Sequence, residues 1–142
     1  MATNPMLDIL VWLRTQLLTD SEITAFVGSG TSARIYAGQM PTDKTYTSLI
    51  VMNDLQGDND KDIPLQKPTV QLRIYGNTML NARELYRDVH SAIHGIQFQG
   101  DDGECIIPME SGTGQLLMDP VLDKPWWYML AFYECVLRYN TQ

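Results

Sequence analysis

Residues 69–95 of this 142-residue chain read TVQLRIYGNTMLNARELYRDVHSAIHG. In the first part, Val70, Leu72 and Ile74 alternate with the residues between them, a period of two that predicts a half-buried strand. After the break at residues 76–78, the apolar residues follow a helical spacing: Ala82, Leu85, Val89, Ala92 and Ile93. Asn77 or Thr78 is the expected N-cap of this helix, and Gly95 is the expected C′ residue. A strand and a helix that each have one apolar face predict a helix lying on a sheet.

The rest of the chain supplies further elements of both kinds. Asn4 followed by Pro5 predicts a helix start, and an apolar stripe runs to Leu17. Asp20 or Ser21 is expected to cap a short second helix that ends at the glycines of residues 28–30. Strands are expected over residues 34–36, 46–55, 104–110, 114–118 and 126–139, with residues 112–114 as a hairpin signal.

These elements predict one α+β domain spanning residues 1–142. Its expected architecture is a two-layer sandwich, in which a mainly antiparallel sheet carries two main helices packed on one face. Between two of the strands lies QGDNDKDIPLQKP, residues 56–68, which is acidic and contains two prolines. This stretch is long for a hairpin loop, and we expect it to form a protruding arm.

The composition limits the classes of function. Hydrophobic residues make up 44% of the chain, so it can bury a core, and no apolar run approaches the roughly 20 residues needed to cross a bilayer. The net charge of −7 argues against wrapping nucleic acid, although an acidic surface lets a polyanion pass without sticking. We expect Cys105 and Cys135 to be small buried thiols of a cytoplasmic protein, and we expect no membrane association.

No motif for catalysis or metal binding is convincing. Asp58, Asp60 and Asp62 match the first positions of a calcium loop, but Ile63 stands where glycine is required and Thr69 where glutamate is required. His90 and His94 have the i, i+4 spacing of a zinc pair, but no third ligand stands out. Phosphate-binding and nucleophile motifs are absent from the sequence, so we expect no cofactor, no metal and no enzyme activity.

Trp126 and Trp127 are the most informative aromatic residues. Two adjacent residues of a strand point to opposite faces, so one ring is expected in the core. The other either meets a partner or is covered by residues 119–125, and the sequence leaves both alternatives open. Trp12 widens the apolar surface of the first helix beyond one face, which fits either the core or a contact with another subunit.

The layout resembles the tail-terminator and tail-completion proteins of long-tailed bacteriophages over nearly the whole chain. The segments that carry the resemblance are EITAFVGSGTSARIYAGQMP at residues 22–41, TYTSLIVMND at residues 45–54, the strand and helix of residues 69–95, and YMLAFYECVLRYN at residues 128–140. The acidic arm and the two adjacent tryptophans are not part of the family pattern.

The resemblance implies a structural virion protein at the head-proximal end of the tail, assembled in the host cytoplasm. It implies a homo-oligomeric ring, typically a hexamer, that caps the tail tube, stops its polymerisation and joins the head, while DNA passes through the centre. The expected partners are therefore the tail tube protein and a neck or head-completion protein. We hypothesise that the arm with Asp58, Asp60 and Asp62 contacts a neighbour or lines the channel, and that Trp126 or Trp127 lies between subunits.

Three alternative functions remain open at this point. The first is a neck or head-completion connector, which sequence patterns separate poorly from a tail terminator because connector components share small α+β folds. A small metal-dependent enzyme would use the acidic cluster, and a monomeric ligand-binding domain would contain an apolar pocket.

Overall fold

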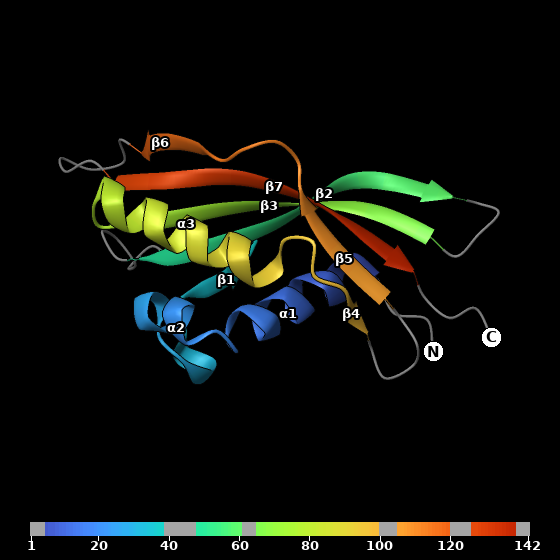
Figure 1. The fold of residues 1–142 in the computed structure, drawn as a ribbon, viewed down its shortest axis with the longest axis horizontal. Coiled ribbons are helices and arrows are strands. Elements are labelled where there is room, and N and C mark those ends of the chain that lie inside the picture. Colours follow the sequence, from blue (N-terminus) through green and yellow to red (C-terminus); the bar gives the residue numbers. More distant parts are fainter. Residues whose placement is uncertain (1–4, 39–47, 61–64, 100–104, 120–125, 139–142) are drawn as a thin grey trace.

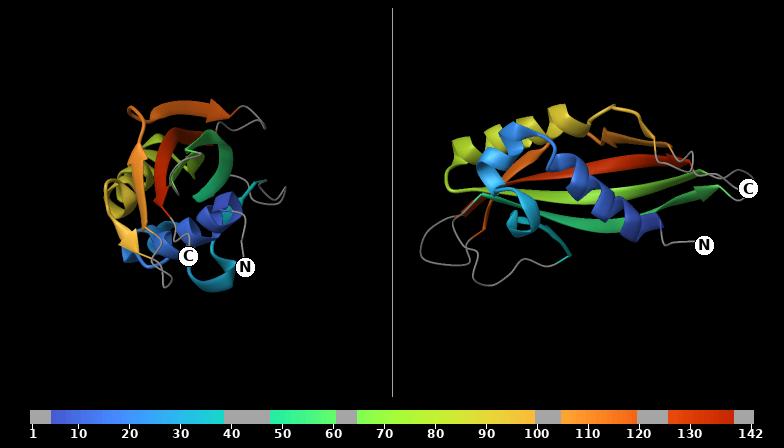
Figure 2. Two further views of the ribbon diagram at one scale, coloured as in Figure 1. Left: turned by 90° about the vertical axis from the view of Figure 1, so that its right-hand side faces the viewer. Right: turned by 90° about the horizontal axis from the view of Figure 1, so that it is seen from below.

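The computed structural model describes residues 5–38, 48–60, 65–99, 105–119 and 126–138. Its described part has two layers, a sheet and a group of helices on one face of it (Figure 1). The views in Figure 2 show the long axis of the molecule running along the strands, with the helices covering only part of the sheet's length. The expected α+β sandwich with helices on one face is therefore confirmed.

The helices begin and end at the residues that the sequence indicates. Helix α1 spans Pro5–Leu17, α2 spans Ser21–Val27 and α3 spans Met79–Ile93, with a short 3₁₀ turn at Gly30–Ser32. The Asp20 carboxylate accepts hydrogen bonds from the backbone N–H groups of Glu22 and Ile23 and caps α2. The Thr78 hydroxyl accepts from the N–H of Asn81 and caps α3. Gly95, with φ +71°, takes the left-handed conformation expected just after the end of α3.

The strands form one mixed sheet. Its strands are β1 (Ile35–Ala37), β2 (Leu49–Asp60), β3 (Leu65–Gly76), β4 (Phe98–Gln99), β5 (Cys105–Glu110), β6 (Gln115–Asp119) and β7 (Trp126–Arg138). Along the sheet the order is β1-β2-β3-β7-β5-β4, and β6 also pairs with β7. The β1–β2 pair is parallel, and the other pairs are antiparallel.

The expected hairpin at residues 112–114 is wrong, because β5 and β6 do not pair with each other. Both strands pair with β7, β5 from Cys105↔Arg138 to Glu110↔Tyr133 and β6 from Gln115↔Leu130 to Asp119↔Trp126. Strands β5 and β6 thus follow each other along the same edge of β7, and residues 111–114 form a bulge between them. Gly112, with φ +79°, permits this local turn, and the N–H of Ser111 still donates to the carbonyl of Phe132.

The acidic segment expected as a loop over residues 56–68 is largely strand. Strands β2 and β3 stay paired from Leu49↔Tyr75 to Asp60↔Leu65, with a register shift after Leu55↔Thr69. Pro68 lies at that shift, where its missing N–H breaks no ladder bond. Figure 1 shows the paired ends of β2 and β3 extending to the right beyond the helices. Residues 61–64, including Asp62, lie outside the described residues.

The main core lies between the helices and one face of the sheet. The alternating residues of β3 and β7 and the apolar stripes of the helices meet there. Among its fully buried members are Leu13, Leu17, Val70, Leu72, Ile74, Leu85, Val89, Ala131 and Tyr133. Burying apolar surface of this kind contributes about 25 cal/mol per Å² removed from water, so this layer contact is the main source of stability.

Gly76 sets how closely α3 approaches the sheet. A Cβ atom at this position would lie 2.4 Å from the backbone N of Ala82 and 2.9 Å from its Cα. Both are backbone atoms of the first turns of α3, and backbone cannot move aside as a flexible side chain can. The residue between the strand and the helix must therefore be glycine.

We predict that Gly76→Ala lowers the free energy of unfolding by about 1–3 kcal/mol, because α3 must shift away from its packed position. Urea unfolding followed by circular dichroism measures the change. The control is Ser91→Ala at an exposed position of the same helix, which is expected to stay within about 0.5 kcal/mol of the parent chain. A Gly76→Ala variant as stable as that control would show that the close approach is not required.

Candidate functional site

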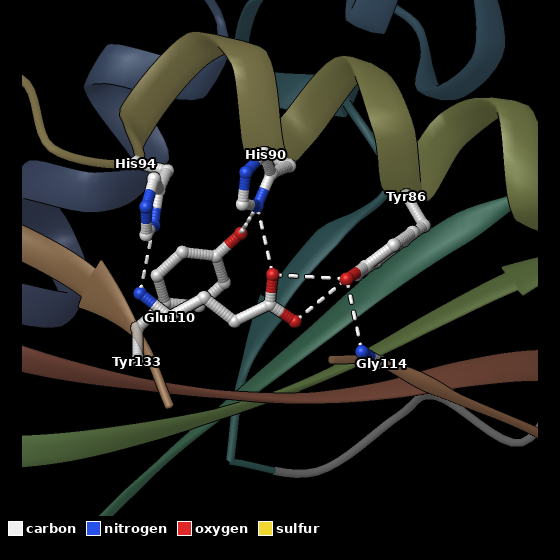
Figure 3. A network of polar contacts seen from close by, with 6 residues as sticks. All are labelled: Tyr86, His90, His94, Glu110, Gly114 and Tyr133. Atoms are coloured by element: carbon white, nitrogen blue, oxygen red, sulfur yellow. Dashed lines mark hydrogen bonds and ion pairs between the residues drawn. The ribbon is translucent and has the colours of Figure 1, made fainter. Parts of the chain in front are cut away.

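A network of polar side chains joins α3 to the break between β5 and β6 (Figure 3). Glu110 ends β5 on the face that looks towards the helices, and its side chain is only 3% exposed. The Tyr86 hydroxyl donates to this carboxyl group, at 2.7 Å from Oε2 and 2.9 Å from Oε1. The Nδ1 atom of His90 lies 2.7 Å from Oε1. A buried carboxyl group is costly unless it is hydrogen-bonded, and both of its oxygens have partners here.

Backbone groups complete this network. The N–H of Gly114 donates to the Tyr86 hydroxyl at 2.9 Å, and the N–H of Glu110 donates to Nδ1 of His94 at 2.9 Å. Because Nδ1 of His94 accepts this bond, its ring proton lies on Nε2. A Cβ at Gly114 would lie 2.6 Å from the Tyr86 ring, so this position must be glycine for the ring to reach Glu110. The network therefore fixes both ends of the bulge to one face of α3.

The tyrosines of this region are held in the neutral form. Burial raises the pKa of Tyr86, and the hydrogen bond to Glu110 adds to this rise. Burial also raises the pKa of Tyr133, whose hydroxyl lies 3.4 Å from Nδ1 of His90, far above its usual range. Burial raises the pKa of the Cys135 thiol to about 12, so this cysteine is a small core residue and a poor nucleophile.

The two histidines take part in this network and do not form an open pair of ligands. Their rings stack with centroids 4.3 Å apart and an angle of 17° between their planes, and both Nδ1 atoms already contact protein groups. Within the described residues, no group of three or more His, Cys, Asp and Glu side chains could hold a metal ion. The sequence predicted the histidine spacing but not the roles of Tyr86, Glu110, Gly114 and Tyr133. One signal in the sequence could have indicated the role of Glu110. It is two residues after Pro108 in β5, so it lies on the same, inward-facing side of the strand, where a charged residue is rare unless it has a partner.

The adjacent tryptophans point to opposite faces, as expected for a strand. Trp127 is half-buried against the main core, whereas Trp126 is 3% exposed on the other face of the sheet. There it joins a second, smaller cluster with Leu49, Val51 and Tyr75, and its ring centroid lies 4.3 Å from that of Tyr75. Trp12 is half-buried and packs edge-on against Phe98 of β4, with centroids 4.7 Å apart. A subunit contact through either residue of the Trp126–Trp127 pair stays a prediction.

The pairing of the backbone strands gives the positions of the arm residues Asp58 and Asp60. Asp58 pairs with Lys67 and Asp60 with Leu65, near the far end of the β2–β3 hairpin. This end is separated from the Trp126 cluster and from the start of α3 by the length of β3, roughly 35 Å at about 3.3 Å per residue. The sequence-predicted residues therefore do not form one site but mark different regions of an elongated molecule.

Apart from Val11 of α1, the exposed large apolar side chains among the described residues lie near the two ends of α3. Met79 and Leu80 are the first residues of the helix. Met118 of β6 lies at the same end, because it pairs with Trp127 of β7, which in turn pairs with Gly76 at the end of β3. The other group follows the end of the helix and consists of Ile96 and Met109, whose Sδ lies 3.8 Å from the position of a Cβ at Gly95. We name these the front patch (Met79, Leu80, Met118) and the rear patch (Ile96, Met109).

Two different apolar patches on one chain suit head-to-tail contact between copies. A ring is built from such heterologous contacts, in which one patch of each copy meets the other patch of the next. The polar network contributes indirectly, since it holds α3 and the β5–β6 edge, and with them both patches, in fixed relative positions. The chain thus presents two separate exposed apolar patches on a small α+β domain.

The comparisons with known proteins specify the class. The sequence profile described as "Tail completion protein gp17" matches residues 12–120. This match spans more than half of the chain, so the chain belongs to the family of gp17 tail completion proteins. The family is one of structural tail completion proteins, so the role of this chain is structural and not enzymatic.

A solved structure has the same fold. It is a chain from the "Virion of native gene transfer agent (GTA) particle", which aligns with a TM-score of 0.60 at 14% sequence identity over 88% of this chain and 91% of that one. A search of curated proteins finds no significant match. In the described residues, no helix is long and apolar enough to cross a membrane.

We predict that Glu110→Ala destabilises the fold by about 1–3 kcal/mol, because the Tyr86 hydroxyl and Nδ1 of His90 lose their buried partner. Tyr86→Phe is expected to cost less, about 1 kcal/mol. The two changes together should cost less than the sum of the single changes by at least 0.5 kcal/mol, a coupling that a double-mutant cycle of urea unfolding measures. Additive effects would show that the two side chains stabilise the fold independently.

The second cluster gives a prediction for alkaline pH. Burial raises the pKa of Tyr75 to about 12, against the opposing effect of the Arg73 guanidinium beside it. An unfolded tyrosine has a pKa near 10, so between pH 10 and 12 the unfolded chain releases a proton that the folded chain keeps. This group's contribution to stability is complete below pH 10 and falls by about 1.4 kcal/mol per pH unit above it.

Tyr75→Phe should remove this part of the slope in urea unfolding between pH 10 and 12. Equal slopes for both chains would contradict the prediction, and measurements at pH 8 control for the lost hydroxyl.

Proposed function

We propose that this tail completion protein forms a closed ring on the end of the tail tube, where it stops tube polymerisation and presents the surface that joins the head. The observation that supports the ring most directly is the placement of the front and rear patches at opposite ends of α3. A helix of 15 residues spans roughly 22 Å, so the two patches are distinct surfaces that two different neighbours can contact. The resemblance described above gives six as the expected number of copies.

The charge of the chain fits the passage of DNA through such a ring. With 17 acidic and 10 basic residues, the chain carries no net attraction for a polyanion. A ring that held DNA through many Lys and Arg contacts would retain it and slow its passage. The expected partners are thus the tail tube protein on one side and a neck or head-completion protein on the other, with DNA passing without specific binding.

The testing experiment mixes the purified chain with tail tubes of the same phage-like particle and examines them by electron microscopy. We expect a ring at one end of each tube and tube lengths that become uniform, because capped tubes no longer grow. Binding to heads or portals alone would replace the proposal with a neck or head-completion role. No binding to either, with a monomer throughout, would contradict assembly altogether.

Variants of the two patches make the test sharper. Met118→Asp in the front patch and Ile96→Asp in the rear patch should each prevent ring formation, because a charge would be buried in the contact. In a head-to-tail contact, a mixture of the two variants still has one intact patch of each kind, so it should form dimers but no rings. Ser91→Asp, on the exposed face of α3 between the patches, is the matched control and should still form rings. Rings formed by either patch variant would show that these surfaces are not the contact.

A further inference from the structure

Strand β6 has one edge that no other described strand pairs with. It pairs with β7, and Figure 1 and the left view of Figure 2 show it along the upper margin of the molecule, with no other described element beyond it. Proteins usually protect such edges with short strands, charges, prolines or bulges, because an open edge accepts another strand. The outer strands β1 and β4 have only three and two residues, and β2 beyond β1 has aspartates at positions 54, 58 and 60. By contrast, β6 reads QLLMD, with one charge at its end.

The backbone groups of Leu116 and Met118 point to this open edge. In an antiparallel pair, residues bonded to the neighbouring strand alternate with residues whose N–H and C=O point away from it. The N–H of Gly114 donates to the Tyr86 hydroxyl and not to β7, so Gly114 is an outward position. Residue 120 is a proline, which has no N–H and cannot take a bonded position. By alternation, Leu116 and Met118 are therefore the outward residues of β6.

The sequence of β6 is complementary to itself in one antiparallel register. When Leu117 faces Leu117 of a second copy, Leu116 lies opposite Met118 and Gln115 opposite Asp119, so apolar residues meet and like charges do not. The outward groups then form two backbone hydrogen bonds in each of the two Leu116–Met118 pairs. Sliding by two residues in either direction would require the N–H of Gly114, which is already used, or an N–H at residue 120, which proline lacks.

The charges around this edge do not oppose the pairing. Met79, Arg83 and Tyr86 share the side of α3 that faces β6, because Tyr86 contacts Gly114 just before this strand. In the paired arrangement, the two β7 strands are three strand spacings apart, roughly 14 Å, which exceeds the Debye length of about 8 Å at physiological salt. The exposed Arg83 and its copy can therefore point apart into water.

We propose that β6 pairs with β6 of a second copy of this chain, which joins the two sheets across a two-fold axis at Leu117. In this dimer, Met118 of the front patch is covered by Leu116 of the second copy. The ring contact of the proposed function needs the same patch, so a copy takes part in either the dimer or the ring. The dimer is the form of the free protein, and it must separate before a ring forms. This last step rests on the proposed function, whereas the pairing of β6 does not.

Charges placed on the axis test the register. Leu117→Lys and Leu117→Glu should each weaken dimerisation of the full chain at least tenfold in sedimentation, because each residue faces its own copy. An equimolar mixture of the two variants should recover dimers, since lysine then faces glutamate. The matched controls are Ser91→Lys and Ser91→Glu on the exposed face of α3, which should dimerise as the parent does, alone or mixed. Circular dichroism checks that each variant keeps the fold.

A disulfide on the axis tests the relation between dimer and ring. Leu117 and its copy form a non-bonded pair with Cα atoms about 4.5 Å apart, a distance that a disulfide spans. Oxidised Leu117→Cys should therefore form a covalent dimer, whereas Thr113→Cys should give only the background of the parent, whose own cysteines all three chains share. The covalent dimer should fail to cap tail tubes, and reduction should restore capping.

The outcomes separate this inference from the proposed function. A parent chain that stays monomeric, or a mixture of Leu117 variants no better than its components, would overturn the pairing of β6, and rings on tubes would still support the proposed function. Dimers as described without any binding to tubes would leave the pairing intact and overturn the proposed function. A covalent dimer that caps tubes as well as the reduced chain would show that the dimer and the ring do not compete.

Discussion

The close packing of α3 on the sheet is the constraint on which the rest of this structure depends. The apolar side of the helix is fully buried, Gly76 lets its first turns touch the strand before it, and Glu110 joins its polar side to the neighbouring edge. The hydrophobic contact holds the helix to the sheet but does not by itself fix its position along the strands, since apolar attraction is non-directional. The hydrogen bonds of Tyr86 and His90 supply that direction, and so they determine where the exposed residues of α3 lie.

The two faces of the sheet have different roles. The helices cover one face, and the opposite face has its own small cluster around Trp126 and Tyr75 at the end where β7 begins. The paired ends of β2 and β3 at the other end extend beyond the helices (Figure 2). The part of the sheet that the helices cover and the paired ends of β2 and β3 are therefore different regions of the molecule.

Local patterns in the sequence predicted the helices and strands. The features that these patterns missed depend on pairing between residues that are far apart in the chain. The alternation of β3, the stripe of α3 and the caps at Asp20 and Thr78 all follow from residues close together in the chain. The extension of β2 to Asp60 was missed because its polar residues favour a loop, and only pairing with β3 makes them a strand. The break between β5 and β6 was missed because β7, the partner of both, comes later in the sequence. The network at Glu110 joins residues 16–43 positions apart, which no spacing rule relates.

The position of β7 in the sheet has a consequence for how the protein is made. This strand follows β3, β5 and β6 in the sequence, yet it lies between β3 on one side and the other two on its other side. A growing chain on the ribosome therefore holds two unconnected pieces of sheet until residues 126–138 emerge. Until then the sheet that joins the two ends of the molecule is not continuous, so the fold can be completed only late in synthesis. A chain that stops before residue 126 has no strand to join β3 to β5 and β6, so it cannot complete this fold.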